Sequence, residues 1–134
     1  MSSFPPTGSG RILDTSALTS AATGKHVYAR ALIATALRSG TVTLLIPVSA
    51  YAEALAAVPH DLRWQLMLLT SSPTVDLDFL DDREKAHEIG DFDTSDVPLA
   101  HAAWCGIRYG WRVVTDRGDE LRAVAPAVEI EPLP

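Results

Sequence analysis

Four acidic residues of this chain occupy positions at which an α/β fold commonly places reactive side chains. Asp14 and Asp116 each follow a short apolar run that is typical of a buried strand. Glu53 and Asp96 lie in or near the first turns of two helical segments. In an open α/β sheet, ligands bind beyond the carboxyl ends of the strands, so these side chains are expected to converge there.

Converging carboxylates limit the chemistry that such a site performs. Four of them in one cleft repel one another strongly unless a cation neutralises them. Hard oxygen ligands suit Mg²⁺ or Mn²⁺, which keep several of their water molecules when bound. The acids therefore predict a site for a hydrated divalent cation.

Each acid also has an ordinary structural explanation. Asp14 and Asp96 are in positions to cap helices, and Asp116 is in a position to serve the turn Thr-Asp-Arg-Gly. Glu53 is harder to explain in this way, because its neighbours in AYAEALAAV are small or apolar, and a lone charge there needs a partner. The four acids together favour a functional site more strongly than any one of them does.

The segments that position these acids alternate between strands and helices. Strands are expected at 11–13, 41–46, 74–79, 112–115 and 128–130. Helices are expected at 16–21, 26–38, 49–58, 61–69, 82–89, 95–109 and 119–124. Strands separated by helices predict a parallel sheet with helices on both faces, which is an α/β fold.

Two helices carry patterns that predict a buried face or a contact surface. In the helix at 26–38, the face expected to be buried consists of Val27, Ala31, Ala34 and Leu37. The helix at 61–69 has more apolar residues than one face can hold, namely Trp64, Leu66, Met67, Leu68 and Leu69. Core packing explains about half of these residues, and the excess is expected to enlarge the core or to form a partner contact.

Length and composition restrict the class of protein. A chain of 134 residues, 47% apolar and 21% charged, fits one domain with its own core. The only cysteine, Cys105, excludes an internal disulfide framework and a zinc cluster of several cysteines, and it fits a cytoplasmic location. No signal peptide or membrane-spanning stretch is recognised. Residues 1–10 hold two Pro, two Gly and three Ser, so a flexible segment is expected to precede one domain over 11–134.

The excess of acidic over basic residues is concentrated in one segment of the chain. The formal net charge is −6, which argues against a protein that coats DNA without regard to sequence. Nine acids and two bases lie between Asp76 and Asp96, and most of this run is expected to form a solvated helix face.

The segments around the four acids resemble the PIN-domain family. The matching stretches are RILDTSAL at 11–18, VSAYAEAL at 48–55, DVPLAHAA at 96–103 and WRVVTDRGDEL at 111–121. Within this family the chain is most similar to the VapC-type toxins of bacterial toxin–antitoxin pairs, and the resemblance extends from about residue 11 to residue 130.

The resemblance implies a fold, an activity and partners. The fold would be a three-layer α/β/α PIN-like domain with a central, mostly parallel sheet of four or five strands. The activity would be Mg²⁺-dependent endoribonuclease cleavage of RNA, with Mn²⁺ as a possible substitute. The partners would be a second copy in a homodimer and a cognate antitoxin protein, all in the cytoplasm.

The resemblance also assigns roles to single residues. Asp14, Glu53 and Asp96 match three of the family's catalytic and metal-binding acids. Many family members carry the fourth acid, or an Asn, two residues after the Thr that ends the strand, where this chain has Arg117. Asp116 is the preferred fourth catalytic and metal-binding acid, and Asp119 is the alternative in a shifted register.

Hydroxyl side chains beside the acids are candidates for supporting contacts. Thr15, Ser16 and Thr115 are expected to contact the water shell of the metal or a phosphate group. His101 is expected to be a packing or surface residue rather than a general base, and Cys105 is expected to be a small core residue.

Two other readings compete with the ribonuclease. A PIN-like scaffold that binds RNA or protein without catalysis would explain the displaced fourth acid. A phosphoacceptor or phosphatase domain that uses Asp14 would need a second acid at position 16 or a lysine late in the chain. Position 16 is Ser and no lysine follows Lys85, so this last reading is the weakest.

Overall fold

The computed structural model describes residues 9–134 and shows a five-stranded, entirely parallel sheet. The strands are β1 (Gly10–Leu13), β2 (Thr43–Pro47), β3 (Val75–Asp78), β4 (Arg112–Thr115) and β5 (Ile130–Pro132). Their order in the sheet is β3-β2-β1-β4-β5, so β1 lies in the centre. In the register, Ile12 lies opposite Leu45 on one side and Val113 on the other.

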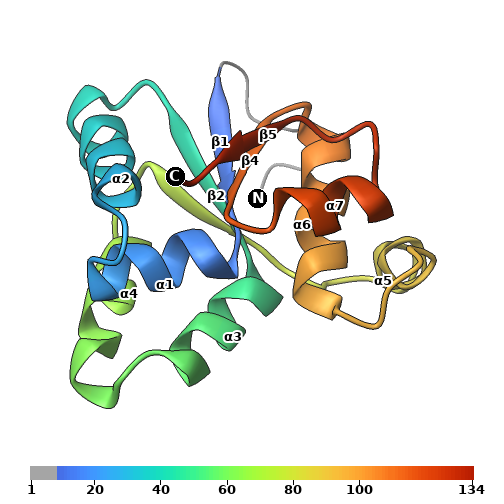
Figure 1. Ribbon diagram of the computed structural model, residues 1–134, viewed down its shortest axis with the longest axis horizontal. Helices are drawn as coiled ribbons and strands as arrows, with labels where there is room; N and C mark the ends of the chain where they lie inside the picture. The colour runs from blue at the N-terminus through green and yellow to red at the C-terminus, as the bar shows by residue number, and fades with distance from the viewer. Residues whose placement is uncertain (1–8) are drawn as a thin grey trace.

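Helices cover both faces of this sheet within residues 9–134. They are α1 (Thr15–Thr23), α2 (Val27–Ser39), α3 (Val48–Ala57), α4 (Arg63–Thr70), α5 (Arg83–Gly90), α6 (Val97–Tyr109) and α7 (Gly118–Val124), with a 3₁₀ turn η1 (His60–Leu62). Figure 1 shows α1, α2 and α4 on one side of the sheet and α6 and α7 on the other. The expected three-layer α/β/α arrangement is therefore confirmed.

Each face of the sheet packs a separate apolar core. One core joins Leu13, Leu44 and Ile46 to the buried sides of α1, α2 and α4. The other joins Ile12 and Val113 to α6 and α7. Strands that are buried on both faces read as continuous apolar runs, which is why these short strands are recognisable in the sequence.

Several boundaries and one helix face differ from the expectation. The helix expected at 61–69 begins with η1, and the last strand lies two residues later than expected. The face predicted for α2 is wrong: Val27 is 80% exposed, whereas Ala29, Ile33 and Ala36 are buried. Both faces of this alanine-rich helix carry apolar residues, so periodicity alone does not distinguish them.

The ends of the chain and its helices add two findings. Gly10 already belongs to β1, and residues 1–8 of the expected flexible segment lie outside the described residues. Between residues 9 and 134, no helix is both long and apolar enough to cross a membrane.

The parallel arrangement brings several chemically distinctive residues to one edge of the sheet. β1 ends just before Asp14, β4 ends just before Asp116, and β3 ends at Asp78. Helix α3 begins directly after β2 and packs against both α1 and α6. We call this side, at which β1, β2, β3 and β4 end, the carboxyl edge.

Candidate functional site

Asp14 is the most deeply buried acid at the carboxyl edge, with 4% of its surface exposed. It is the N-cap of α1, and its Oδ1 accepts hydrogen bonds from the Ala17 amide at 3.0 Å and from the Ser16 hydroxyl at 2.6 Å. Burial raises the pKa of Asp14 above its ordinary value, and the nearby Asp116 carboxylate adds to the rise. The hydrogen bonds oppose this rise without cancelling it.

Ser16 links Asp14 to Asp116. While the Ser16 hydroxyl donates to Asp14, its oxygen accepts a hydrogen bond from the Asp116 amide at 2.9 Å. Thr115 is buried at the end of β4, and its hydroxyl accepts from the Arg117 amide at 2.9 Å. These bonds hold the start of α1 against the turn that follows β4, so the two aspartates lie near each other.

Asp96 joins this group through a cation of the same chain. It is the N-cap of α6, where its Oδ1 accepts from the Leu99 amide at 3.1 Å. Its Oδ2 forms an ion pair with the Arg117 Nη1 at 2.8 Å. Arg117 also pairs with Glu120, and this hydrogen bond, together with the pairing to Asp96, raises the pKa of the guanidinium.

Glu53 is exposed, as is Asp116, whereas Asp14 is buried and Asp96 is partly buried. The neighbours Ala52 and Ala56 of Glu53 are also exposed, so Glu53 lies at the surface, where its charge does not need the partner that the apolar neighbours suggested. No ion pair of Glu53 occurs among residues 9–134. Its helix α3 nevertheless packs between α1 and α6, whose N-termini carry Asp14 and Asp96.

The remaining candidate residues lie in different surroundings. Asp119 is fully exposed and lies 3.7 Å from Arg122, one turn along α7. The Thr15 hydroxyl is buried and has no hydrogen-bond partner within the described part of the chain. A buried hydroxyl without a partner is costly, so Thr15 is well suited to a ligand or a water molecule.

The donor set at the carboxyl edge fits a hard divalent cation. Asp14, Asp96 and Asp116 offer carboxylate oxygens at this edge, and Ser16 and Thr15 offer hydroxyl oxygens beside Asp14. Among the described residues, these three carboxylates do not form a group whose oxygens all lie within 4.8 Å of one another. Oxygen donors of this kind suit Mg²⁺ or Mn²⁺. No cationic side chain pairs with Asp14 in the described residues, whereas Arg117 already neutralises part of the charge of Asp96.

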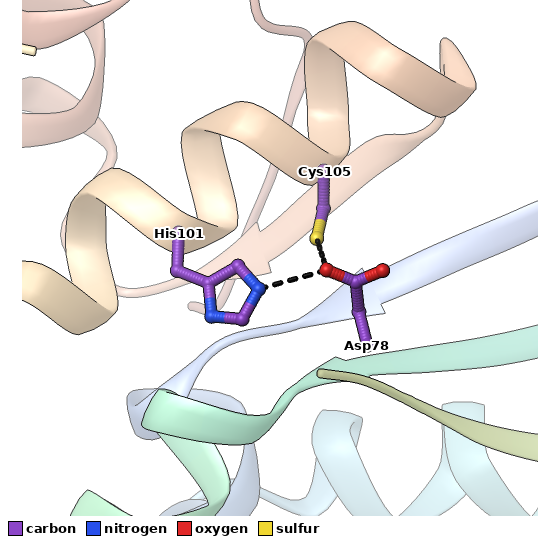
Figure 2. Close-up of side chains that lie close together, drawn as sticks. All are labelled: Asp78, His101 and Cys105. Atoms are coloured by element: carbon purple, nitrogen blue, oxygen red, sulfur yellow. Dashed lines mark hydrogen bonds and ion pairs between the residues drawn. The ribbon is translucent and has the colours of Figure 1, made fainter. Parts of the chain in front are cut away.

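A second polar cluster lies beside this edge, and little in the sequence indicated it. Asp78 Oδ2 lies 2.8 Å from His101 Nε2 and 3.5 Å from Cys105 Sγ. Figure 2 shows His101 and Cys105 both turned toward this carboxylate. His101 Nδ1 lies 2.7 Å from the Ser49 hydroxyl, and Lys85 Nζ donates to Asp78 Oδ1 at 3.2 Å. His101 and Cys105 are buried, as expected for packing residues.

Electrostatics in this cluster differ from those at Asp14. Burial alone would raise the pKa of Asp78, but hydrogen bonds from His101 and Lys85 and the charge of Lys85 lower it below its ordinary value. Burial and the Asp78 carboxylate raise the pKa of the Cys105 thiol well above its usual range. The one signal in the sequence was the spacing of His101 and Cys105, four residues apart on an apolar helix.

The fold matches solved structures at low sequence identity. One chain of VapBC2 from Rickettsia felis, solved with a DNA fragment from its promoter, is 11% identical, and the match covers 93% of this chain and 99% of that chain with a TM-score of 0.67. A domain of a functionally unknown protein from Methanocaldococcus jannaschii is 12% identical, with coverage of 95% and 92% and a TM-score of 0.51.

Comparisons of sequence alone add no relative. No protein-family model matches the chain, and no curated protein matches it at a significant level. The structural matches are too distant in sequence to carry over an activity. The chain has the three-layer fold of the PIN-like, VapC-type proteins that the motifs around its four acids resemble.

Proposed function

We propose that this chain is a metal-dependent endoribonuclease and the toxin of a toxin–antitoxin pair. The observation that supports the proposal is the position of Asp14, Asp116 and Asp96 at the ends of β1 and β4 and at the start of α6, where Ser16 and Arg117 link these segments, in a chain with a VapC-like fold. Asp14 is buried without a cationic partner in the described residues, which is an unfavourable state for a carboxylate that no ligand compensates.

The chain's own residues would divide the work of phosphodiester hydrolysis. Asp14 and Asp96, with Glu53 and Asp116 directly or through water, would hold Mg²⁺ or Mn²⁺. A bound ion of this kind lowers the pKa of a coordinated water and neutralises charge on the phosphoryl oxygens. The hydroxyls of the same edge would orient water or phosphate, as proposed for Thr15, Ser16 and Thr115.

The RNA substrate and the protein partners belong to the same proposal. With a net charge of −6, the chain has little general attraction for nucleic acid, so a structured RNA recognised by its shape fits best. Trp64, Met67 and Leu68 are about 60% exposed on α4, whereas Leu66 and Leu69 are buried. We assign the exposed residues to a contact with the antitoxin or with a second copy in a homodimer, in the cytoplasm.

Arg117 supports a second candidate, a PIN-like scaffold with weak or no catalysis. Its guanidinium lies on Asp96, where it competes with a divalent cation for the same carboxylate. Arg117 also stands at the position where many VapC-type proteins carry an acid or an Asn. Such a scaffold would bind RNA or a partner protein without cleaving it.

Cleavage assays with purified protein distinguish the two candidates. A structured RNA is incubated with the chain in Mg²⁺, in Mn²⁺ and in excess chelator. The nuclease predicts cleavage that chelator abolishes and added cation restores. Binding of the RNA without cleavage in either cation would favour the scaffold.

Variants at the fourth acid test the register of the site. Asp96→Asn is expected to abolish cleavage, because it removes a charge at the centre of the proposed site while keeping the helix cap. Asp116→Asn is expected to weaken cleavage less, and exposed Asp119→Asn to change it little. A large loss at Asp119 with a near-normal rate at Asp116 would place the fourth acid at Asp119.

A further inference from the structure

We propose that Asp78, His101 and Cys105 form a second, buried metal site that takes a zinc-like cation. One donor atom from each residue lies within 4.8 Å of the other two, and all three residues are buried. Two of them, His101 and Cys105, project from the same side of α6 one turn apart, and Asp78 faces them from the end of β3 (Figure 2). This site is separate from the acids of the proposed nuclease, and its existence does not depend on that activity.

Two of the three donor separations, those measured from Asp78 Oδ2, are near those of a tetrahedral coordination shell, and the third is no more than 4.8 Å. Zinc binds nitrogen, oxygen and sulfur at about 2.0–2.3 Å, which separates neighbouring donors by roughly 3.4 Å. The observed separations from Asp78 Oδ2 are 2.8 Å to His101 Nε2 and 3.5 Å to Cys105 Sγ. A cation between them therefore requires only a few tenths of an ångström of opening on the histidine side.

Neighbouring side chains hold the ligands in the orientation that a metal needs. The Ser49 hydroxyl contacts His101 Nδ1 at 2.7 Å and leaves Nε2 turned toward Asp78 and Cys105. Lys85 engages the opposite oxygen of Asp78, Oδ1. Metal-binding histidines and carboxylates are commonly oriented by outer partners of this kind.

The charges balance when the cation binds. The Cys105 Sγ–H bond breaks, a bond from sulfur to the cation forms, and the thiol proton leaves to solvent. His101 stays neutral, because its proton moves from Nε2 to Nδ1. The Nδ1–H group then donates a hydrogen bond to the Ser49 hydroxyl. One thiolate and Asp78 then match a divalent cation, while Lys85 keeps Asp81 as a counter-ion at 3.3 Å.

The donor types of this cluster select a different metal from the one proposed for the aspartates at the carboxyl edge. An imidazole, a thiolate and one carboxylate suit Zn²⁺, whereas Mg²⁺ prefers oxygen ligands alone. Lys85 also lies over the Trp104 ring at 4.7 Å, so α5 closes over this cluster from outside. We therefore assign the site a structural role that fixes β3 to α6, with metal entering as the chain folds.

Cobalt is the probe that tests this assignment. The full chain is unfolded under reducing conditions and refolded with Co²⁺, whose bonds to thiolate absorb in the near ultraviolet. Cys105 is the only cysteine, so this band reports one site. The expected result is a thiolate band that saturates at one Co²⁺ bound to sulfur per chain and disappears when Zn²⁺ displaces the Co²⁺. Refolded wild-type chain without the thiolate band overturns the proposal, whether or not it retains metal elsewhere.

Variants locate the metal within the fold. Cys105→Ser is expected to abolish the band, and His101→Gln to raise the Co²⁺ dissociation constant at least about 100-fold. Ser49→Ala, which removes only the outer partner of His101, is expected to raise it about 10-fold. Asp14→Asn is the matched control and keeps the band. Loss of the band in Asp14→Asn would contradict the assignment, and if a ligand variant fails to fold, the wild-type band still decides.

Discussion

Asp14 and Asp78 lie at the carboxyl ends of β1 and β3, and their side chains are 4% and 7% exposed. Asp14 receives hydrogen bonds from a serine hydroxyl and a backbone amide, and its pKa is raised, chiefly by burial. Asp78 is also penalised by burial, but Lys85 and His101 lower its pKa. The two carboxylates are therefore similarly buried, but only Asp78 has a compensating positive charge beside it.

This difference explains why the two regions are expected to respond differently to metal and to mutation. A cation from solvent can neutralise Asp14 without displacing anything. At Asp78 a cation must replace a thiol proton and fit between groups that already bond to one another. We thus expect easily exchanged cations at Asp14 and a slowly exchanged, zinc-like cation at Asp78.

The largest effect on stability is expected at Asp78. Asp78→Asn removes the charge that compensates Lys85 and disrupts the bond to His101, so the free energy of unfolding should fall by about 3 kcal/mol. Urea unfolding measures this change. Asp76→Asn, at an exposed position of the same strand, is the control and should stay within about 0.5 kcal/mol of wild type. A small loss of unfolding free energy in Asp78→Asn would show that the ion pair of Asp78 with Lys85 does not stabilise the fold.

A cation is expected to stabilise the wild-type chain through Asp14. A ligand that binds only the folded form adds about 2.7 kcal/mol at a hundredfold excess over its dissociation constant. Thermal unfolding with and without Mn²⁺ measures the gain, which should be absent in Asp14→Asn. An equal gain in Asp14→Asn would place the cation elsewhere.

Without metal, Asp14→Asn should make the chain more stable at neutral pH. Asn still caps α1, and the variant removes a buried charge. The folded pKa of Asp14 is raised, so the wild type loses stability as pH rises from its ordinary value of 3.8 through that raised pKa. We expect a melting temperature roughly 4 °C higher for Asp14→Asn at pH 7, which is about 1 kcal/mol, and no difference near pH 3.

The opposite pH dependence of the folding stability is expected from Asp78. Its folded pKa is lowered, so its contribution is complete above 3.8 and is lost only as pH falls through the lowered value. The difference in stability between wild type and Asp78→Asn should therefore shrink only in strong acid. Unfolding curves at several pH values measure the stability difference between wild type and each variant. If that difference changed with pH in the same direction for Asp14→Asn and Asp78→Asn, the comparison would be contradicted.

The smallest effect is expected at Arg117. Arg117→Gln removes the positive charge that competes for Asp96, so Mn²⁺ should bind up to about fivefold more tightly, as expected for a partly exposed ion pair. Calorimetric titration measures this affinity. Arg122→Gln, which alters the exposed pair with Asp119, is the matched control. Weaker Mn²⁺ binding in Arg117→Gln would show that the guanidinium supports the site.

The strands and the first acids were predictable because their signals are local. The run at 112–115 appears as β4 with the same bounds, and Asp14 and Asp96 cap helices where the sequence places them. The position of Arg117 on Asp96 was not predictable, because it depends on how the turn after β4 meets the start of α6. The partners of Asp78 were missed for the same reason, since they come from α5 and α6.

The measurement that tests the central claim most directly is single-turnover cleavage of one structured RNA across a Mn²⁺ titration. The wild type should cleave only with the cation, and Asp14→Asn should be slower by about 10²-fold or more at every concentration. Asp119→Asn should stay within about twofold of the wild type, since this side chain lies in solvent. Cleavage by folded Asp14→Asn at the wild-type rate, or cleavage by the wild type in excess chelator, would contradict the assignment of the carboxyl edge as the active site.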